Sequence, residues 1–289
     1  MRAPWVMAGF FAVTQGFCCA HAQPPMPADQ LVREVVYNEL HDHVSHGYWR
    51  FWVDSHTPKE SLREEFIETA EGPNSRIELS NGHPLDAEGR QLEQVRLHRL
   101  LNSPAEQARR RQEYDDNEKR VGRIVAMLPD AFLYEYAGEE NGCYRLRFHP
   151  NPDYPAHSIE ARIFHAMSGE LWVSAKYKRL IRLDGHLTQD VSFGFGILGR
   201  LYQGGRFSLQ RTQVSPTDWK TERFELHMKG RAILFKIITQ EISELRSGFS
   251  PVAARLDLVK GAALLYQIEP ESARISAVSL SVDRNSSNP

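Results

Sequence analysis

The chain has 289 residues and a nearly balanced charge, with 35 Lys and Arg against 37 Asp and Glu. A net charge of -2 argues against nucleic acid or an anionic membrane surface as the main partner. Beyond the N-terminal stretch no segment is apolar for long enough to span a bilayer, so we expect a protein that is not membrane-spanning.

The N-terminus has the three zones of a secretory signal peptide. Arg2 gives a positive start, the stretch from Trp5 to Phe17 is mostly apolar and uncharged, and Ala20-His21-Ala22 offers the small residues that a signal peptidase reads. We therefore predict that residues 1–22 are a signal peptide, that cleavage follows Ala22, and that the protein is exported.

The first part of the exported chain alternates between helix and strand patterns. Apolar residues at helical spacing predict a helix over Ala28–Leu40. The aromatic-rich segment Gly47–Val53 predicts a strand, and Leu62–Thr69 and Arg76–Leu79 predict two more, separated by the turn residues Gly72-Pro73-Asn74.

A charged helical insertion follows, over about 86–128. Its first helix is predicted over Asp86–Leu101. The sequence Ser103-Pro104-Ala105-Glu106 then ends that helix and begins the next, with a capping serine, a proline at the first helical position and a glutamate at the third. The middle of the second helix, Arg109–Arg120, is almost entirely polar and is typical of a solvated face.

The chain from Ala131 to Leu245 consists mostly of strand patterns with turn residues between them. Apolar and polar residues alternate in Tyr144–His149, and similar patterns predict strands over Ala161–Ala166, Leu171–Ala175, Leu180–Leu187, Arg206–Val214, Lys220–Met228 and Ala232–Ile242. Turns are predicted at Ser168-Gly169, Asp184-Gly185, Ser215-Pro216 and Lys229-Gly230. Short connections between strands indicate an antiparallel meander, and the lack of a βαβ rhythm argues against doubly wound folds.

Three histidines follow the first predicted helix in the pattern H-x-H-x-x-H. His41, His43 and His46 have the spacing that some zinc hydrolases use, which leaves a metal-dependent hydrolase as an alternative. A histidine near a helix C-terminus also caps carbonyl groups and interacts favourably with the helix dipole. Since no partner motif follows downstream, we expect no bound metal, no cofactor and no catalytic residues.

A glycine-rich loop, Gly194–Gly199, matches the dinucleotide fingerprint G-x-G-x-x-G. A nucleotide site needs this motif between a strand and a helix, whereas here a turn and a strand follow. We interpret the loop as buried or as a gate beside an apolar cavity, because its glycines permit movement and it carries Phe195 and Ile197.

Several motifs resemble a family of uncharacterised exported bacterial proteins described as LolA-like. They are Met127–Leu133, Ala161–Met167, Asp184–Val191 and His227–Ala232, and the similarity covers roughly residues 28–250. The resemblance implies the fold of periplasmic lipoprotein carriers, which is a curved, incomplete antiparallel barrel with helices over an apolar cavity. No catalytic residues come with this family.

The expected fold class is therefore α+β, mostly β. We expect a curved antiparallel incomplete barrel with helices packed on or over its concave side. The predicted organisation is a signal peptide over 1–22, a LolA-like half-barrel over 23–250 with the helical insertion at about 86–128, and a partly disordered C-terminal extension over 251–289.

The resemblance and the strand patterns together favour a non-enzymatic periplasmic binding protein. We expect it to carry or sense a lipid or lipoprotein acyl chain, and a periplasmic or outer-membrane protein is a possible further partner. A protein–protein interaction or sensor module without bound lipid is the alternative. The strand parity that is wholly apolar in Gly47–Val53 should face the ligand. The predicted cavity residues are Trp49, Phe51, Phe66 and Phe148, with Phe195 and Ile197 at the rim.

Overall fold

The computed structural model describes residues 26–41, 47–193, 199–232, 236–252 and 256–267. The helices in these ranges are α1 (Ala28–Leu40), α2 (Ala87–Asn102), α3 (Pro104–Ala131), α4 (Ile159–Phe164) and α5 (Leu258–Gln267). The strands are β1 (Trp49–His56), β2 (Ser61–Ile67), β3 (Asn74–Ser80), β4 (His83–Pro84), β5 (Phe132–Glu140), β6 (Cys143–Pro150), β7 (Met167–Ser174), β8 (Leu180–Leu187), β9 (Val191–Phe193), β10 (Gly199–Leu201), β11 (Arg206–Gln213), β12 (Trp219–Ala232) and β13 (Lys236–Pro251).

All of these strands belong to one antiparallel sheet. Its order is β4-β3-β2-β1-β13-β12-β11-β8-β7-β6-β5, with β10 beside β12 and β9 beside β10. The first strand, β1, pairs with the last, β13, so the two ends of the strand-forming chain meet inside the sheet. The sheet is curved and open, and the prediction of an α+β, mostly β fold is confirmed.

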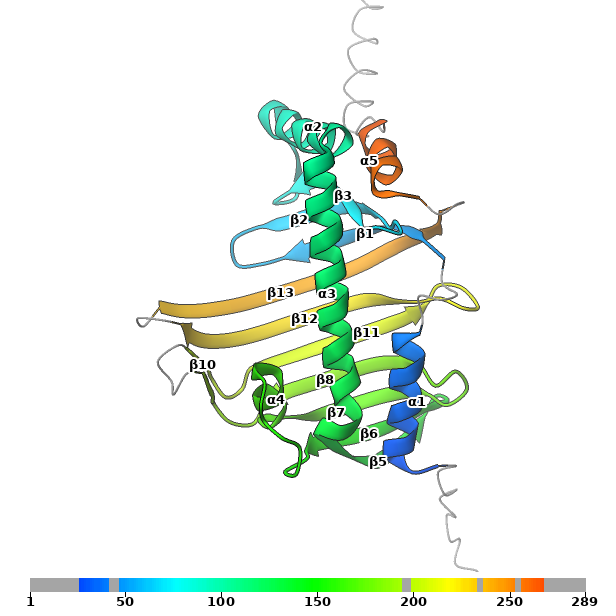
Figure 1. The fold of residues 1–289 in the computed structure, drawn as a ribbon, viewed down its shortest axis with the longest axis vertical. Helices are drawn as coiled ribbons and strands as arrows, with labels where there is room; N and C mark the ends of the chain where they lie inside the picture. Colours follow the sequence, from blue (N-terminus) through cyan, green and yellow to red (C-terminus); the bar gives the residue numbers. More distant parts are fainter. Residues whose placement is uncertain (1–25, 42–46, 194–198, 233–235, 253–255, 268–289) are drawn as a thin grey trace, which may run out of the picture.

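Two helices cover the concave face of the sheet, as predicted. Figure 1 shows α3 running across the strands from β5 towards β3, with α1 beside its lower half. The apolar stripe of α1, formed by Leu31, Val32, Val35 and Val36, is buried against the sheet. In α3 only Pro129 and Ala131 are fully buried, and both lie in its last turn. Most of α3 therefore lies over the sheet without closing onto it.

The remaining large helices, α2 and α5, pack at the β3 end of the sheet. Leu97 and Leu100 of α2 meet Leu258 and Leu265 of α5 in two small buried clusters. The α2 helix also covers the edge of β3, where the backbone N–H of Ile77 donates to Glu93 Oε1 at 2.9 Å. The charged insertion is thus built into the end of the sheet.

One predicted strand, Ala161–Ala166, is wrong, because this segment forms the short helix α4. Ser158 caps the helix by accepting from the backbone N–H of Ala161 at 3.0 Å, and Glu160 lies in the first turn. Ala161 and Phe164, three residues apart, are the buried positions. The cap and this spacing outweigh the strand propensity of Ile163 and Phe164.

Three of the predicted turns are also wrong, since their glycines lie within strands. Gly169 in β7 and Gly185 in β8 face each other in register, and Gly230 lies within β12. A Cβ atom on Gly169 would lie 2.7 Å from the ring of Phe148, and one on Gly185 would collide with the ring of Phe207. Gly169 and Gly185 therefore allow large rings to lie across the sheet.

Candidate functional site

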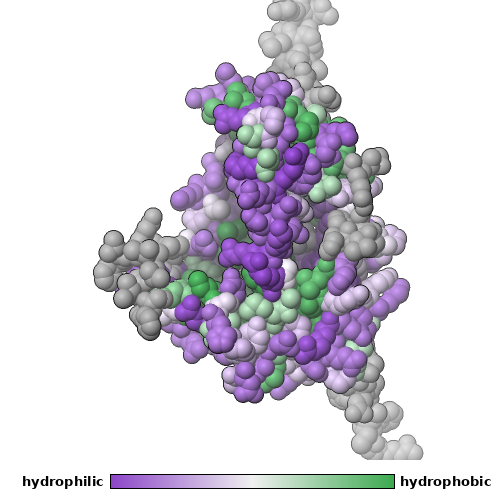
Figure 2. Space-filling model, viewed as in Figure 1, coloured by the Kyte–Doolittle hydropathy of each residue, from purple (hydrophilic) through white to green (hydrophobic). Residues whose placement is uncertain are grey.

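A cavity of about 960 Å³ lies under the helices, between the sheet, α1 and α3, and is here called the lower cavity. Its volume lies at the upper end of the range of about 300–1,000 Å³ found for ligand pockets. Aliphatic and aromatic side chains predominate in its lining, including Val36, Val125, Leu128, Phe148, Leu171, Leu183, Phe207 and Leu209. Figure 2 shows hydrophobic residues on either side of the hydrophilic α3 in this part of the molecule.

Strand parity explains why this lining is apolar. In β7, Met167, Leu171 and Val173 are buried on the helix side, while Ser168, Glu170 and Trp172 point to the other face. Opposite this floor, α3 contributes Val125 and Leu128 from its apolar last turns. The charged middle of α3 offers no comparable side chains, so the apolar lining ends where the helix becomes polar.

Charged residues form one wall of the lower cavity, where α1 ends. Glu39 on α1 pairs with Arg211 on β11 and, at 3.3 Å, with Arg179. The side chains of all three are at least 85% buried. Such a buried network is costly to break and fixes the end of α1 onto the sheet. The cavity is therefore apolar over most of its surface, with an ionic wall on one side.

A second cavity of about 460 Å³, here called the upper cavity, lies beneath the upper half of α3. Phe51, Val53 and Phe66 form the apolar part of its floor, on β1 and β2. The rings of Phe51 and Phe66 stack with their centroids 5.7 Å apart. Tyr114 lies on the α3 side, and burial together with nearby carboxylates raises its pKa to about 12, so its hydroxyl stays neutral.

The two cavities adjoin each other along α3. Tyr48, Thr69, Tyr114 and Glu118 line both of them. An elongated ligand is thus able to occupy both spaces while lying along the underside of one helix.

The residues predicted from the sequence divide between these cavities. Phe51 and Phe66 line the upper cavity and Phe148 lines the lower one. Trp49 is buried beside Phe51 and Val53, and its indole Nε1 donates to Asp218 at 3.3 Å. The structure therefore places Phe51, Phe66 and Phe148 at cavity walls and Trp49 in the packing beside them.

Some sequence predictions fall outside the described residues. These are the rim residues Phe195 and Ile197 and two of the three histidines, His43 and His46. The third, His41, ends α1: its Nδ1–H donates to the Tyr37 carbonyl at 2.7 Å and its ring stacks on Tyr37. His41 thus acts as a helix cap. Across the ranges given above, no three His, Cys, Asp or Glu side chains converge to hold a metal.

The opposite face of the sheet carries a polar depression of about 890 Å³, here called the outer groove. Cross-strand register sets two rows of side chains there, one rich in histidine and arginine, the other rich in carboxylates. The rows are His149, Ser168, His186, Arg206, His227 and Glu241, and Arg147, Glu170, Asp184, Ser208, Glu225 and Ser243.

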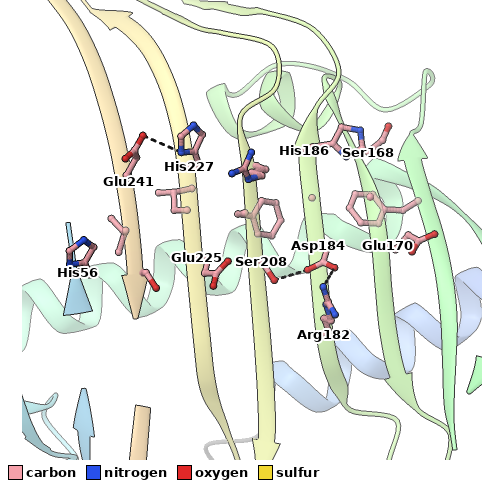
Figure 3. Close-up of a pocket in the computed structure, with 18 of the residues that line it drawn as sticks. His56, Ser168, Glu170, Arg182, Asp184, His186, Ser208, Glu225, His227 and Glu241 are labelled. Atoms are coloured by element: carbon pink, nitrogen blue, oxygen red, sulfur yellow. Dashed lines mark hydrogen bonds and ion pairs between the residues drawn. The ribbon is translucent and has the colours of Figure 1, made fainter. Parts of the chain in front are cut away.

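Figure 3 shows how several outer-groove side chains pair with one another. His227 points to Glu241 with 3.2 Å between Nδ1 and Oε1, and Asp184 lies between Ser208 and Arg182. The Ser208 hydroxyl donates to Asp184 at 2.6 Å. This serine is thus held by a carboxylate, without the imidazole that would activate it as a nucleophile.

No local pattern in the sequence indicates which residues join the two cavities. Tyr48 and Tyr114 are 66 positions apart in the chain, and their meeting depends on where α3 crosses the sheet. Only the aromatic alternation in β1 was a usable signal, and it identified the floor of the upper cavity through Phe51.

Comparison with known protein families and with curated proteins finds no match for this chain. None of the helices in the described part of the chain is both long enough and apolar enough to cross a lipid bilayer.

Proposed function

We propose that this protein binds the acyl chain of a lipid or lipoprotein in the lower cavity, as a non-enzymatic carrier or sensor of the LolA-like type. The observation that supports this proposal most strongly is the cavity of about 960 Å³, which is lined by apolar residues of five strands and of the three helices α1, α3 and α4. The signal peptide predicted for residues 1–22 supports a periplasmic site of action.

The packing around the lower cavity favours a space that holds a ligand over a core that is merely imperfectly packed. Protein interiors contain few voids larger than a water molecule, because unfilled apolar space forfeits dispersion contacts. The buried cluster beneath the cavity, which includes Leu146, Phe148 and Val173, already forms a core. A further apolar space of this size beside it is more consistent with an occupant than with imperfect packing.

Energetics make an apolar cavity sufficient for this function. Burying hydrocarbon stabilises a complex by about 0.8 kcal/mol per CH₂ group, so a sixteen-carbon chain supplies roughly 12 kcal/mol before the costs of association. Specific polar contacts to the chain are not required. The same binding mode suits a free lipid and a lipidated protein, which share the acyl chain.

The test is binding of a fluorescent fatty acid to the delipidated protein and to a variant with a filled cavity. Val125→Trp adds a large ring to α3 where it lines the lower cavity, and we expect an affinity loss of about tenfold or more. The matched control is Leu133→Trp on β5, whose side chain is 44% exposed and lies outside the cavity lining. Parent protein that binds no probe, or Val125→Trp protein that binds it as well as the parent, would contradict the proposal.

A further inference from the structure

The outer groove crosses the face of the sheet opposite to α1 and α3, and Figure 3 shows its two rows of side chains next to each other. The row that runs from His149 to Glu241 is here called the histidine row. In it, Arg206 on β11 lies directly opposite His186 on β8 and opposite His227 on β12. Side chains in such positions have Cβ atoms about 4.5–5.5 Å apart, and like charges there destabilise a sheet. The register thus brings together three side chains that can carry positive charge.

The other row, from Arg147 to Ser243, is here called the carboxylate row, and each of its acidic residues already has a basic partner. Asp184 and Glu225 each pair with the arginine two residues earlier on their own strand, at 2.7 and 3.5 Å. Those arginines lie on the side away from the histidine row. Glu170 lies 3.6 Å from Arg147 within the row. The carboxylate row is therefore not the counter-charge of the histidine row, although its oxygen atoms can accept further hydrogen bonds.

Arg206 is the cation that these pairings leave without a counter-charge. Within the described ranges of the chain, neither Arg206 nor His186 has an ion-pair or hydrogen-bond partner for its side chain, and both are exposed. The third member of the group, His227, lies 3.2 Å from Glu241. Arg206 differs from an ordinary surface arginine because it lies between two imidazoles in a depression of about 890 Å³. The groove thus offers an unused guanidinium fork for an anionic group.

The dimensions of the two rows suit an extended ligand made of sugar rings. Neighbouring strands lie about 4.7–4.9 Å apart, which is close to the length that one hexose adds to an extended polysaccharide. The histidine row crosses six strands from β6 to β13, a span of about 24 Å. The two rows are two residues apart along each strand, or about 6.6 Å, which is comparable to the width of a sugar ring.

We propose that the outer groove binds a linear acidic polysaccharide, whose sugar rings carry carboxylate groups. The chain lies across the strands. One sugar carboxylate accepts a pair of hydrogen bonds from the Arg206 guanidinium, beside the imidazole of His186. The hydroxyl groups on the other edge of the rings donate to Asp184 and Glu225. Because this site lies on the opposite face of the sheet from the lower cavity, it does not depend on acyl binding.

The carboxylate row favours this class of ligand over a polyphosphate. A polyphosphate in the groove would face the oxygens of Glu170, Asp184 and Glu225 with acceptors only, and like charges would repel. The hydroxyl groups of a polysaccharide meet the same oxygens as hydrogen-bond donors. A neutral polysaccharide, in turn, would leave the charge of Arg206 uncompensated. The groove should therefore select a polymer that carries both negative charge and hydroxyl groups.

The test is calorimetric titration of the full chain with an oligogalacturonide and with its fully methyl-esterified form. The two probes share the sugar backbone and differ in the charge of their carboxyl groups. We expect the acid form to bind at least about tenfold more tightly, and its binding to weaken as salt screens the exposed charges. Inorganic polyphosphate, the third probe, should bind more weakly than the acid form. Equal binding of acid and ester, tighter binding of polyphosphate, or no binding of the acid form would each overturn the proposal.

Variants separate the Arg206 contact from general charge attraction. Arg206→Gln should lower the affinity for the acid form about tenfold. The matched control is Arg99→Gln on α2, which removes the same charge from an exposed position outside the groove and should leave the affinity unchanged. Arg206→Lys keeps the charge without the planar fork, so it should lose part of the affinity and serves if Arg206→Gln fails to fold. Equal losses in Arg206→Gln and Arg99→Gln would contradict the assigned contact.

Discussion

Asp218 is a buried carboxylate that ties the start of β1 to the turn between β11 and β12. It accepts from the Gly47 backbone N–H at 2.6 Å, from the Trp49 indole at 3.3 Å, from the Thr217 hydroxyl at 2.8 Å and from the Ser215 hydroxyl. Burial opposes ionisation here, but these hydrogen bonds prevail and lower the pKa of Asp218. The ionised form therefore stabilises the native state.

Asp218→Asn should lower the free energy of unfolding by about 1–3 kcal/mol at pH 7, because a charge-assisted network is lost. A lowered native pKa contributes stability above the ordinary value of 3.8, and that contribution disappears as the pH falls through the native value. The deficit of the variant should thus shrink below about pH 4. Urea denaturation at pH 7 and pH 3 measures it, with the exposed Asp116→Asn on α3 as the control. An equal deficit at both pH values would contradict the role of the charge.

The pKa of Glu64 is shifted in the opposite direction to that of Asp218. Because its native pKa is raised above the ordinary 4.5, its contribution to stability is present below that value and is lost as the pH rises through the native one. Glu64→Gln should therefore increase the free energy of unfolding at pH 7, by less than about 1 kcal/mol given its partial exposure, and have little effect at pH 4. A variant that is less stable than the parent at pH 7 would show that Glu64 serves the fold.

At the scale of single elements, the two edges of the sheet are protected from further strand pairing in different ways. At one edge β4 covers only the end of β3, and α2 covers the rest: Glu93 accepts from Ile77, and Arg96 donates to the Ser75 carbonyl. At the other edge β5 pairs only with β6 among the described residues, and it carries Glu135, Glu139 and Glu140. Charged side chains oppose edge-to-edge pairing, so both edges are protected by different means.

Glu93→Ala should expose the β3 edge. The Ile77 N–H and the Arg96 guanidinium would lose their acceptor, which should lower the free energy of unfolding by about 1–3 kcal/mol. The freed edge should also promote association. Thermal denaturation followed by light scattering measures both effects, and Glu88→Ala, an exposed change in the same helix, is the control. Equal stability and scattering of the two variants would contradict a covering role for Glu93.

At the scale of the whole molecule, glycines set how closely the sheet and its aromatic residues pack. Gly169→Ala should lower the free energy of unfolding by about 1–3 kcal/mol, since its Cβ would collide with the β8 backbone and with Phe148. Gly122→Ala on α3 is the matched change: its Cβ would meet only Leu40, at 3.9 Å, so it should stabilise the helix by about 0.5–1 kcal/mol. Thermal unfolding separates the two, and a neutral Gly169→Ala would contradict the close approach.

Local sequence patterns predicted those parts of the fold that depend on local order. The helix Ala28–Leu40 and the strand Leu180–Leu187 have the predicted bounds because their apolar periodicity agrees with their final packing. Gly169 was misinterpreted because a glycine signals a turn locally, whereas here it accommodates a ring from another strand. The helix α4 was missed although Ser158 is a recognisable cap.

The candidate site was less accessible from the sequence. Phe51 was found through the strand parity of β1, which is a local property, and Phe66 and Phe148 were predicted as its neighbours from other strands. Glu64 and Glu244 were not among the predicted site residues, because nothing nearby in the chain shows that α3 lies over them. Glu64 and Glu244 are 180 positions apart in the sequence. They come to line the same cavity only because β2 and β13 both pair with β1 and because α3 crosses the sheet above them.

For the proposed acyl ligand, the attachment of α3 at both ends has a consequence for the rate of release. At its start, Arg111 pairs with Glu71 at 3.0 Å and Tyr114 lies against Gly72, and at its end the helix continues directly into β5. A helix fixed in this way does not swing open like a hinged lid, so a bound molecule must leave sideways past its flanks. Residence time then depends on brief local separations of α3 from α1 or α4, and variants along those flanks should change the dissociation rate more than the association rate.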